Sequence, residues 1–403
     1  MVRSKVLSWP LGVSYDATHL TPGATTPSHR SINPSMSKKY LFSTVALLAV
    51  ILLSGCSTSA VRGTTWPGLA ASNDAVYLSD GAQVYAINLK DGQELWHYPA
   101  KGSSKLLFYS TPYITADGLL IVGSAGTDHS LVGLNPKDID PTTKAPVEAW
   151  KFIGAKDHWV ATPLAIDNRL FAPNADGNLY IFDLSDGQTN KQPIKVVQLS
   201  GHLWGQPATD GKLIFVNSLD HSVFAIDKDS YNIIWHKDLN GAIPNSPVLG
   251  ADGNLYVGSF ASELAKFDPA TGNYQSMGKT DDWVWGTPTL VENNLYFGDL
   301  SGKFYSYNIE AGKYNWNPVQ PDGPITTSPL LINDVLLIAT ESGSIYEVDK
   351  DGHSKLWSQP GGKIYTTPVI SGDLVLVSPL GGESYLYAYD LNGHQVWAFK
   401  PQN

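Results

Sequence analysis

Ala86-Ile87-Asn88-Leu89-Lys90-Asp91-Gly92-Gln93-Glu94-Leu95-Trp96 is the stretch that decides the fold of this chain. It predicts a strand that ends at Asn88, a turn through Asp91-Gly92, and a second strand that reaches Trp96. Asp-Gly between two apolar stretches favours a tight turn, because glycine adopts positive φ without a Cβ clash. The stretch is therefore expected to form a β-hairpin closed by a tryptophan.

The same hairpin frame returns further along the chain. Each copy has an Asp or Asn at the end of its first strand, a turn, and a Trp at the same place in its second strand. The copies are Ala225 to Trp235, Ser306 to Trp316, Glu347 to Trp357 and Ala388 to Trp397. Repetition of one hairpin at long intervals is typical of a repeat architecture.

A second marker recurs with the hairpin: a proline, usually after Thr, Ser or Gln, that opens an apolar strand. It lies at Pro67, Pro112, Pro163, Pro207, Pro247, Pro288, Pro329 and Pro368, at intervals of 39 to 51 residues. Units of about 40 residues match four short strands with their turns. We therefore expect an all-β fold, an eight-bladed β-propeller of four-stranded antiparallel blades, over residues 66–403. The last unit is as apolar as the others, which favours a closed ring over a solenoid with polar caps.

Three units depart from the frame. The second carries an insertion over residues 136–147, and the third and fifth lack the tryptophan. Departures of this kind are expected in loops.

Composition narrows the functional classes. The 403 residues carry a formal net charge of −10, and no basic stripe indicates a nucleic-acid partner. A single cysteine, Cys56, excludes an intramolecular disulfide and a cysteine-based metal cluster.

The N-terminal region has the pattern of an export signal. Two lysines precede an apolar run of 14 residues, 40–53, which is short for a membrane span. The run ends in Leu53-Ser54-Gly55-Cys56, which resembles the bacterial lipobox, and the resemblance implies acyl chains such as palmitate on Cys56. We expect a lipoprotein signal peptide over 36–55 and a lipidated tether over 56–65. Residues 1–35 are expected to be a disordered leader or to precede the true start. The alternative is an ordinary signal in which the cysteine is coincidental.

The hairpin frame is similar to the PQQ-like repeat of quinoprotein-type eight-bladed propellers, from about Pro67 to the C-terminus. In that family the tryptophan packs between neighbouring blades, where a buried indole supplies a large apolar area. The resemblance implies this structural docking role for Trp96, Trp150, Trp235, Trp316, Trp357 and Trp397.

The resemblance does not extend to the cofactor. Quinoprotein dehydrogenases hold PQQ beneath a disulfide of adjacent cysteines and also bind calcium, whereas this chain has one cysteine. We therefore expect no cofactor and no enzyme activity, and a quinoprotein oxidoreductase is the least favoured alternative.

An exported, lipid-anchored propeller of this repeat type resembles the BamB family, the lipoprotein scaffolds of outer-membrane protein assembly. The resemblance implies a monomeric, non-enzymatic scaffold that binds protein partners in the cell envelope. The expected location is the outer membrane facing the periplasm, or the outer surface of the cytoplasmic membrane in a single-membraned cell.

Aromatic residues recur just ahead of the strand-opening prolines, where the chain would enter the central channel. The candidate binding face consists of Tyr109, Trp159, Trp204, Trp283, Trp285 and Tyr365. Convergent aromatic rings often mark binding surfaces, so a surface lipoprotein that binds carbohydrate or peptide there is the alternative function. The rings would otherwise only fill the channel.

Polar residues are expected on the same face, in the turns between second and third strands. Carboxylates recur there, among them Asp176 and Asp299, and tight turns favour aspartate on conformational grounds alone. His129, His158, His202 and His221 would also lie there, but their spacing matches no metal-binding motif. We therefore expect no metal site.

Overall fold

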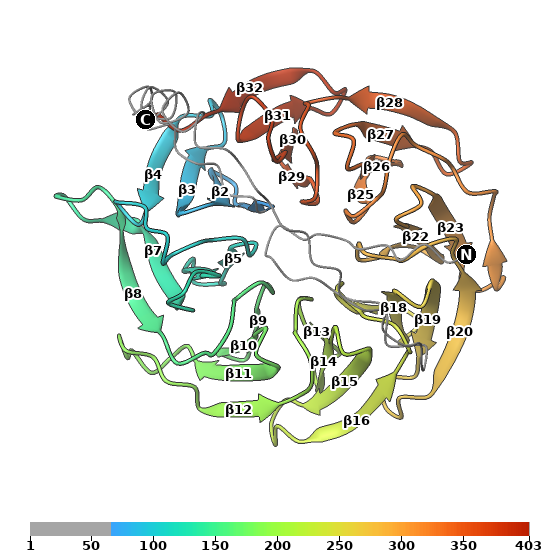
Figure 1. The fold of residues 1–403 in the computed structure, drawn as a ribbon, viewed down its shortest axis with the longest axis horizontal. Coiled ribbons are helices and arrows are strands. Elements are labelled where there is room, and N and C mark those ends of the chain that lie inside the picture. The colour runs from blue at the N-terminus through green and yellow to red at the C-terminus, as the bar shows by residue number, and fades with distance from the viewer. Residues whose placement is uncertain (1–65, 403) are drawn as a thin grey trace, which may run out of the picture. The chain divides into compact units, whose positions relative to one another are not determined.

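The computed structural model describes residues 66–402, all within one compact unit. The signal peptide, the tether and Cys56 lie outside the described residues. The described residues form 32 strands in eight four-stranded antiparallel sheets, and none of them belongs to a helix. Figure 1 shows the sheets as blades arranged in a ring around a central axis. This confirms the eight-bladed β-propeller.

In every blade the four strands follow one another in chain order. Blades 1 to 4 consist of β1 (Gly68–Ala71), β2 (Ala75–Asp80), β3 (Gln83–Asn88), β4 (Glu94–Tyr98); β5 (Tyr113–Ile114), β6 (Leu120–Gly123), β7 (Leu131–Ile139), β8 (Pro146–Phe152); β9 (Leu164–Ile166), β10 (Arg169–Pro173), β11 (Asn178–Asp183), β12 (Lys195–Gln198); and β13 (Ala208–Thr209), β14 (Leu213–Asn217), β15 (Ser222–Asp227), β16 (Ile233–Asp238).

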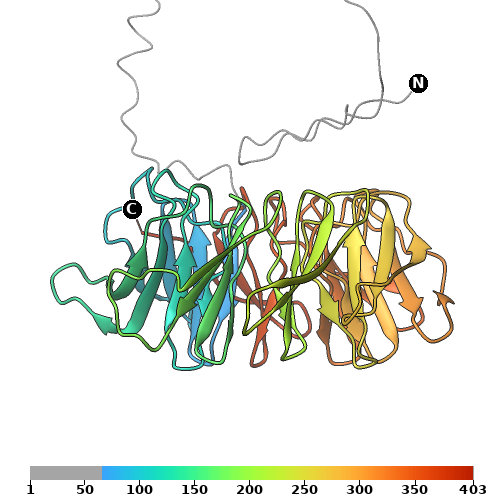
Figure 2. The same cartoon turned by 90° about the horizontal axis from the view of Figure 1, so that it is seen from below.

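Blades 5 to 8 repeat this order. They consist of β17 (Val248–Leu249), β18 (Leu255–Ser259), β19 (Glu263–Phe267), β20 (Tyr274–Lys279); β21 (Thr289–Val291), β22 (Asn294–Gly298), β23 (Phe304–Asn308), β24 (Lys313–Tyr314); β25 (Leu330–Ile332), β26 (Val335–Ala339), β27 (Ile345–Val348), β28 (Ser354–Ser358); and β29 (Val369–Ser371), β30 (Leu374–Val377), β31 (Leu386–Asp390), β32 (Gln395–Phe399). Figure 2 shows the blades edge-on, with their turns gathered at two opposite faces.

The register of the β3–β4 hairpin explains the spacing of the sequence frame. Ala86 pairs with Trp96 across the two strands, as Ala225 pairs with Trp235 in blade 4. A small side chain opposite the tryptophan leaves the indole free to lie against its own blade and reach the next one. The turn is held by Asn88, whose side-chain oxygen accepts a hydrogen bond from the amide of Lys90 at 2.9 Å.

The tryptophans of the frame join consecutive blades. Five of the six donate their indole N–H to a backbone carbonyl of the following blade's outer hairpin. The pairs are Trp96 to Pro136 (3.2 Å), Trp235 to Pro269 (2.7 Å), Trp316 to Lys350 (3.3 Å), Trp357 to Leu391 (3.4 Å) and Trp397 to Leu89 (3.0 Å). The sixth, Trp150, stacks on Phe182 of blade 3 with ring centroids 6.1 Å apart.

The hydrophobic core lies between the blades. In each of its clusters, buried side chains of one blade interdigitate with those of a neighbour. The ring closes in the same way, because Leu69 and Ile87 of blade 1 share a cluster with Leu386 and Trp397 of blade 8. Among the described strands, none is exchanged between the first and last blades.

The insertion in the second unit is not a loop, contrary to the expectation. It lengthens β7 and β8 into a hairpin with a turn at Asp140, whose carboxylate accepts backbone hydrogen bonds from Thr142 and Thr143. Ile139 pairs with Pro146, and the Asp140 N–H donates to the Ala145 carbonyl at 3.0 Å, so backbone pairing continues up to the turn.

Candidate functional site

The central channel opens into a cavity of about 400 Å³. Segments just ahead of the first strand of every blade contribute to its wall, because each unit begins with its innermost strand. One lining residue from each blade, in order, is Trp66, Thr111, Thr162, Gln206, Ser246, Thr287, Ser328 and Thr367. Among the described residues that line the cavity, none carries a formal charge.

Four aromatic rings gather in this wall around Trp66. The centroid of Trp66 lies 6.1 Å from that of Trp204, 6.4 Å from that of Trp285 and 6.4 Å from that of Tyr365. All four side chains are partly exposed. The structure thus brings together three of the six residues of the predicted binding face, with Trp66 as an additional member.

The other three residues of the predicted binding face lie outside this cluster of rings. Tyr109 lines the cavity but is 6% exposed. Trp159 is 1% exposed and packs against Phe152 and Tyr180, so it belongs to the core between blades 2 and 3. Trp283 stacks on Phe260 with centroids 4.5 Å apart and does not line the cavity.

Phe260 is an aromatic neighbour of the cavity residue Trp285 that the sequence analysis missed. It lies in the turn between β18 and β19, and its ring centroid is 5.6 Å from that of Trp285. Its position in the repeat could have revealed it. The corresponding turn of most other units carries an acidic residue, whereas this turn carries an aromatic ring.

A belt of hydroxyl groups holds the backbone that carries these rings. In four consecutive units the residue ahead of the strand-opening proline donates its backbone N–H to the hydroxyl of its counterpart in the next blade. The bonds run from Gln206 to Ser246 (2.9 Å), Ser246 to Thr287 (3.1 Å), Thr287 to Ser328 (3.1 Å) and Ser328 to Thr367 (2.9 Å). They explain why Thr or Ser so often precedes the proline, and they link blades 4 to 8 around the cavity.

Charged groups lie at the rim of the cavity beside Tyr365. Burial raises the pKa of the Tyr365 hydroxyl, and the nearby Glu341 carboxylate raises it further. Burial also raises the pKa of Glu341, and the Lys363 ammonium opposes that rise. Lys363 contacts the Tyr365 hydroxyl at 3.3 Å. The rim thus combines a ring with two opposite charges, whereas the wall offers rings, hydroxyls and the amides of Gln206 and Asn245.

The carboxylates in the turns between second and third strands accept hydrogen bonds from nearby groups of their own blades. Asp299 is fully buried and accepts hydrogen bonds from the Tyr305 hydroxyl at 2.8 Å and the Lys303 amide at 3.0 Å. Asp176 accepts from the Tyr180 hydroxyl at 2.7 Å. These contacts agree with the conformational explanation of the acidic turns.

Among residues 66–402, no helix has the length and apolar character that would carry it through a membrane.

The fold and the interlocking tryptophans define the class of this protein, an eight-bladed propeller of PQQ-like repeats. The family model of the outer membrane protein assembly factor BamB matches residues 57–237, 219–331 and 321–403, and the chain belongs to this family.

Two curated relatives, both BamB proteins, match this chain at modest sequence identity. The outer membrane protein assembly factor BamB of Shewanella oneidensis is 26% identical over 216 residues, which cover 48% of this chain and 51% of the relative. That of Yersinia pestis is 22% identical over 293 residues, which cover 69% of this chain and 70% of the relative. The match thus spans about half of the first relative and just over two thirds of the second.

Solved structures share the fold. The crystal structure of BamB from Moraxella catarrhalis has a TM-score of 0.65 at 15% identity, covering 80% of this chain and 96% of that one. The computationally designed Ika8 protein has a TM-score of 0.63 at 13% identity, covering 81% of this chain and 96% of that one. At these identities the likeness concerns the fold alone.

Proposed function

We propose that this protein is a monomeric, non-enzymatic scaffold of the cell envelope that binds protein partners of outer-membrane protein assembly. The observation that carries the proposal is the cavity mouth, where all eight blades present an uncharged wall with four clustered aromatic rings. Partly exposed, convergent aromatic rings supply rigid contact area for a protein partner at low entropic cost. Membership of the BamB family supports the choice of partner class.

A photo-crosslinking experiment in native membranes tests the proposal. A crosslinking amino acid replaces Tyr365 at the mouth or, as a control, Lys90 in the β3–β4 turn at the opposite face. We expect crosslinks to outer-membrane assembly proteins from position 365 and none from position 90. Crosslinks from neither position, or equal crosslinks from both, would contradict binding at the mouth.

We further propose that Cys56 carries the lipid that holds the scaffold at the outer membrane, facing the periplasm. The support is the lipobox-like sequence that ends at Cys56. Metabolic labelling with palmitate checks this, because label on the wild-type chain should disappear in Cys56→Ser. Label that persists in the variant would contradict the proposal.

A second function, binding of a carbohydrate or an extended peptide, is favoured by the composition of the same wall. The Trp204 and Trp285 rings could stack on sugar faces while Gln206 supplies an amide beside them. Glycan-array binding that is lost in Trp204→Ala and Trp285→Ala, without crosslinks to assembly proteins, would support this alternative.

A further inference from the structure

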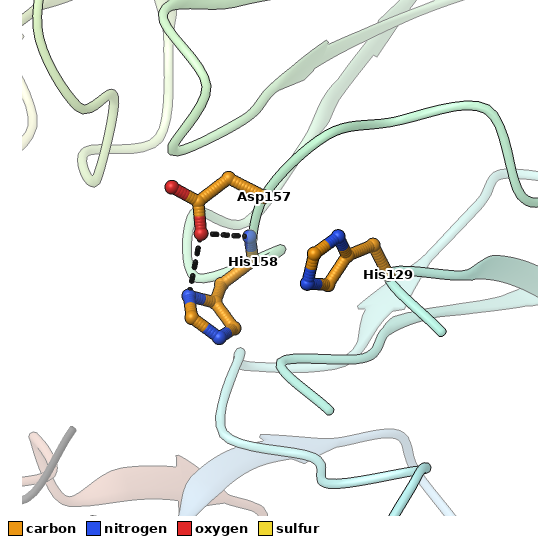
Figure 3. A group of neighbouring side chains, drawn as sticks. All are labelled: His129, Asp157 and His158. Carbon is orange, nitrogen blue, oxygen red and sulfur yellow. Dashed lines mark hydrogen bonds and ion pairs between the residues drawn. The ribbon is translucent and has the colours of Figure 1, made fainter. Parts of the chain in front are cut away.

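Three of the four histidines on the loop face meet at one place, although they come from three separate loops. His129 lies in the turn between β6 and β7, His158 between β8 and β9, and His202 between β12 and β13. Asp157 lies among them, as Figure 3 shows for His129 and His158. His221 lies in the next blade, in the turn between β14 and β15.

The distances within this cluster are short. The Asp157 Oδ1 atom lies 2.6 Å from His158 Nδ1 and accepts the backbone N–H of His158 at 2.7 Å. The rings of His129 and His158 have centroids 5.3 Å apart at an interplanar angle of 69°. One ligand atom from each of His129, Asp157 and His158 lies within 4.8 Å of the other two, and all three residues are partly exposed.

The backbone on both sides of the cluster is fixed by the core. The indole N–H of Trp159 donates to the carbonyl of His129 at 2.7 Å, and Trp159 directly follows His158 in the chain. The carbonyl of His158 in turn accepts the N–H of Ala175 at 3.0 Å. Because Trp159 is 1% exposed, the two histidines are anchored to the same buried side chain. Such support holds ligands in place before an ion arrives.

We propose that His129, Asp157 and His158 form a binding site for a divalent transition-metal ion of the zinc type. Two imidazoles and one carboxylate are a ligand set that zinc accepts, with a fourth position left for water. Bonds of 2.0 to 2.1 Å place tetrahedral ligand atoms roughly 3.3 Å apart, so rotations about χ1 and χ2 are needed to close the site around an ion.

His202 takes an outer position in this site. Its Nδ1 atom lies 3.9 Å from Asp157 Oδ2 and contacts the carbonyl of Ala175. The distance to Asp157 is too long for a hydrogen bond, so His202 is not counted among the ligands.

Calorimetric titration of the purified, untagged protein with Zn²⁺ tests the proposal. We expect one ion per chain, and affinity lowered by at least about 10-fold in His129→Asn and in His158→Gln. Asparagine suits position 129 because φ there is 44°, a left-handed conformation that asparagine tolerates. Circular dichroism of each variant verifies that the propeller is folded.

His221→Asn is the matched control. His221 also has positive φ, at 65°, and lies on the same face outside the group, so its replacement should leave the affinity unchanged. Co²⁺ provides a second readout, since tetrahedral coordination would give visible absorption that His129→Asn abolishes. The proposal is overturned if the wild-type protein binds no Zn²⁺, if His129→Asn binds as tightly as wild type, or if His221→Asn weakens binding equally.

Discussion

The contact between Gly92 and Trp397 shows at the scale of single residues how the sequence frame works. Gly92 has φ of +72°, and a Cβ atom placed there would lie 2.6 Å from Cε3 of the Trp397 indole. The glycine therefore serves two purposes, since it permits the turn and leaves room for the tryptophan of the blade that closes the ring. Gly272 meets Trp235 in the same way, at 2.6 Å.

Replacing Gly92 by alanine is expected to destabilise the protein through both effects. Gly187 is the matched control, because it has a similar φ of +64° with no atom within 4 Å of an added Cβ. Both variants force alanine into a left-handed conformation, so this strain cancels in the comparison. Gly92→Ala alone also clashes with the indole, and such overpacking typically costs about 1–3 kcal/mol. Denaturant unfolding should therefore show Gly92→Ala to be less stable than Gly187→Ala by that amount. Equal stabilities would contradict a tight contact.

For single residues, the sequence predicted the roles that follow a repeated pattern and missed those that do not. The docking role of Trp96 or Trp397 was implied by a local pattern repeated at a regular interval. The cluster of His129, Asp157 and His158 has no local pattern, because its members come from loops of different units. Trp159 was expected at the mouth because it lies ahead of Pro163, yet its ring turns into the core between blades 2 and 3. Position in the repeat therefore located the loop but not the direction of each side chain.

At the scale of one element, Glu263 fastens the outer strand of blade 5. Its buried carboxylate accepts hydrogen bonds from the Tyr274 hydroxyl at 2.6 Å and the Ser276 hydroxyl at 3.0 Å, and it pairs with the Lys279 ammonium at 2.6 Å. All three partners lie on β20, whereas Glu263 lies on β19. Blade 5 lacks the tryptophan of the frame, so these contacts hold a strand that is not anchored by an indole of its own.

The pKa of Glu263 gives this contact a defined pH dependence. Burial alone would raise that pKa, but the bonds from Lys279, Tyr274 and Ser276 outweigh it and hold the pKa below its ordinary value. A lowered folded-state pKa stabilises the protein above the unfolded value, about 4.3, and the stabilisation is lost as the pH falls through the folded pKa.

Glu263→Gln should therefore lower the free energy of unfolding by about 1–3 kcal/mol at pH 7, with a gap from wild type that narrows below about pH 4. Unfolding curves measured from pH 7 to pH 3 check this. Glu310→Gln, at an exposed carboxylate of blade 6, should stay within about 0.5 kcal/mol of wild type throughout. A gap for Glu263→Gln that is constant with pH would contradict the ionised role.

Element boundaries followed the sequence where the repeat was regular. β3 ends at Asn88 and β32 covers residues 395–399, as the frame indicates. The insertion of blade 2 was misassigned, because the tight turn at Asp140 lacks the glycine that six of the other seven outer hairpins carry. A turn held by threonine amides on one carboxylate leaves a weaker trace in the sequence.

At the scale of the whole molecule, the ring has one seam that differs from the rest. Within residues 66–402 the chain itself crosses every other seam between consecutive blades, whereas blades 8 and 1 meet through side-chain and backbone contacts. There the Trp397 indole donates to Leu89, the Ser371 hydroxyl donates to the Ser72 carbonyl at 2.9 Å, and the Thr366 hydroxyl contacts the Pro67 carbonyl. The contacts resemble those of other seams, but no stretch of the described chain connects blade 8 to blade 1 covalently.

Weakening that seam should therefore open the ring more readily than weakening a seam that the chain crosses. Trp397→Phe removes the donor to a buried carbonyl and should cost about 1–3 kcal/mol. It should also speed hydrogen exchange first in β1 and β29, which face each other across the seam. Trp235→Phe makes the same change between blades 4 and 5, where the connection from β16 to β17 keeps the blades together, so exchange in β13 and β17 should rise less. Equal local exchange in the two variants would mean that the side-chain contacts, and not chain connectivity, determine how firmly each blade holds its neighbour.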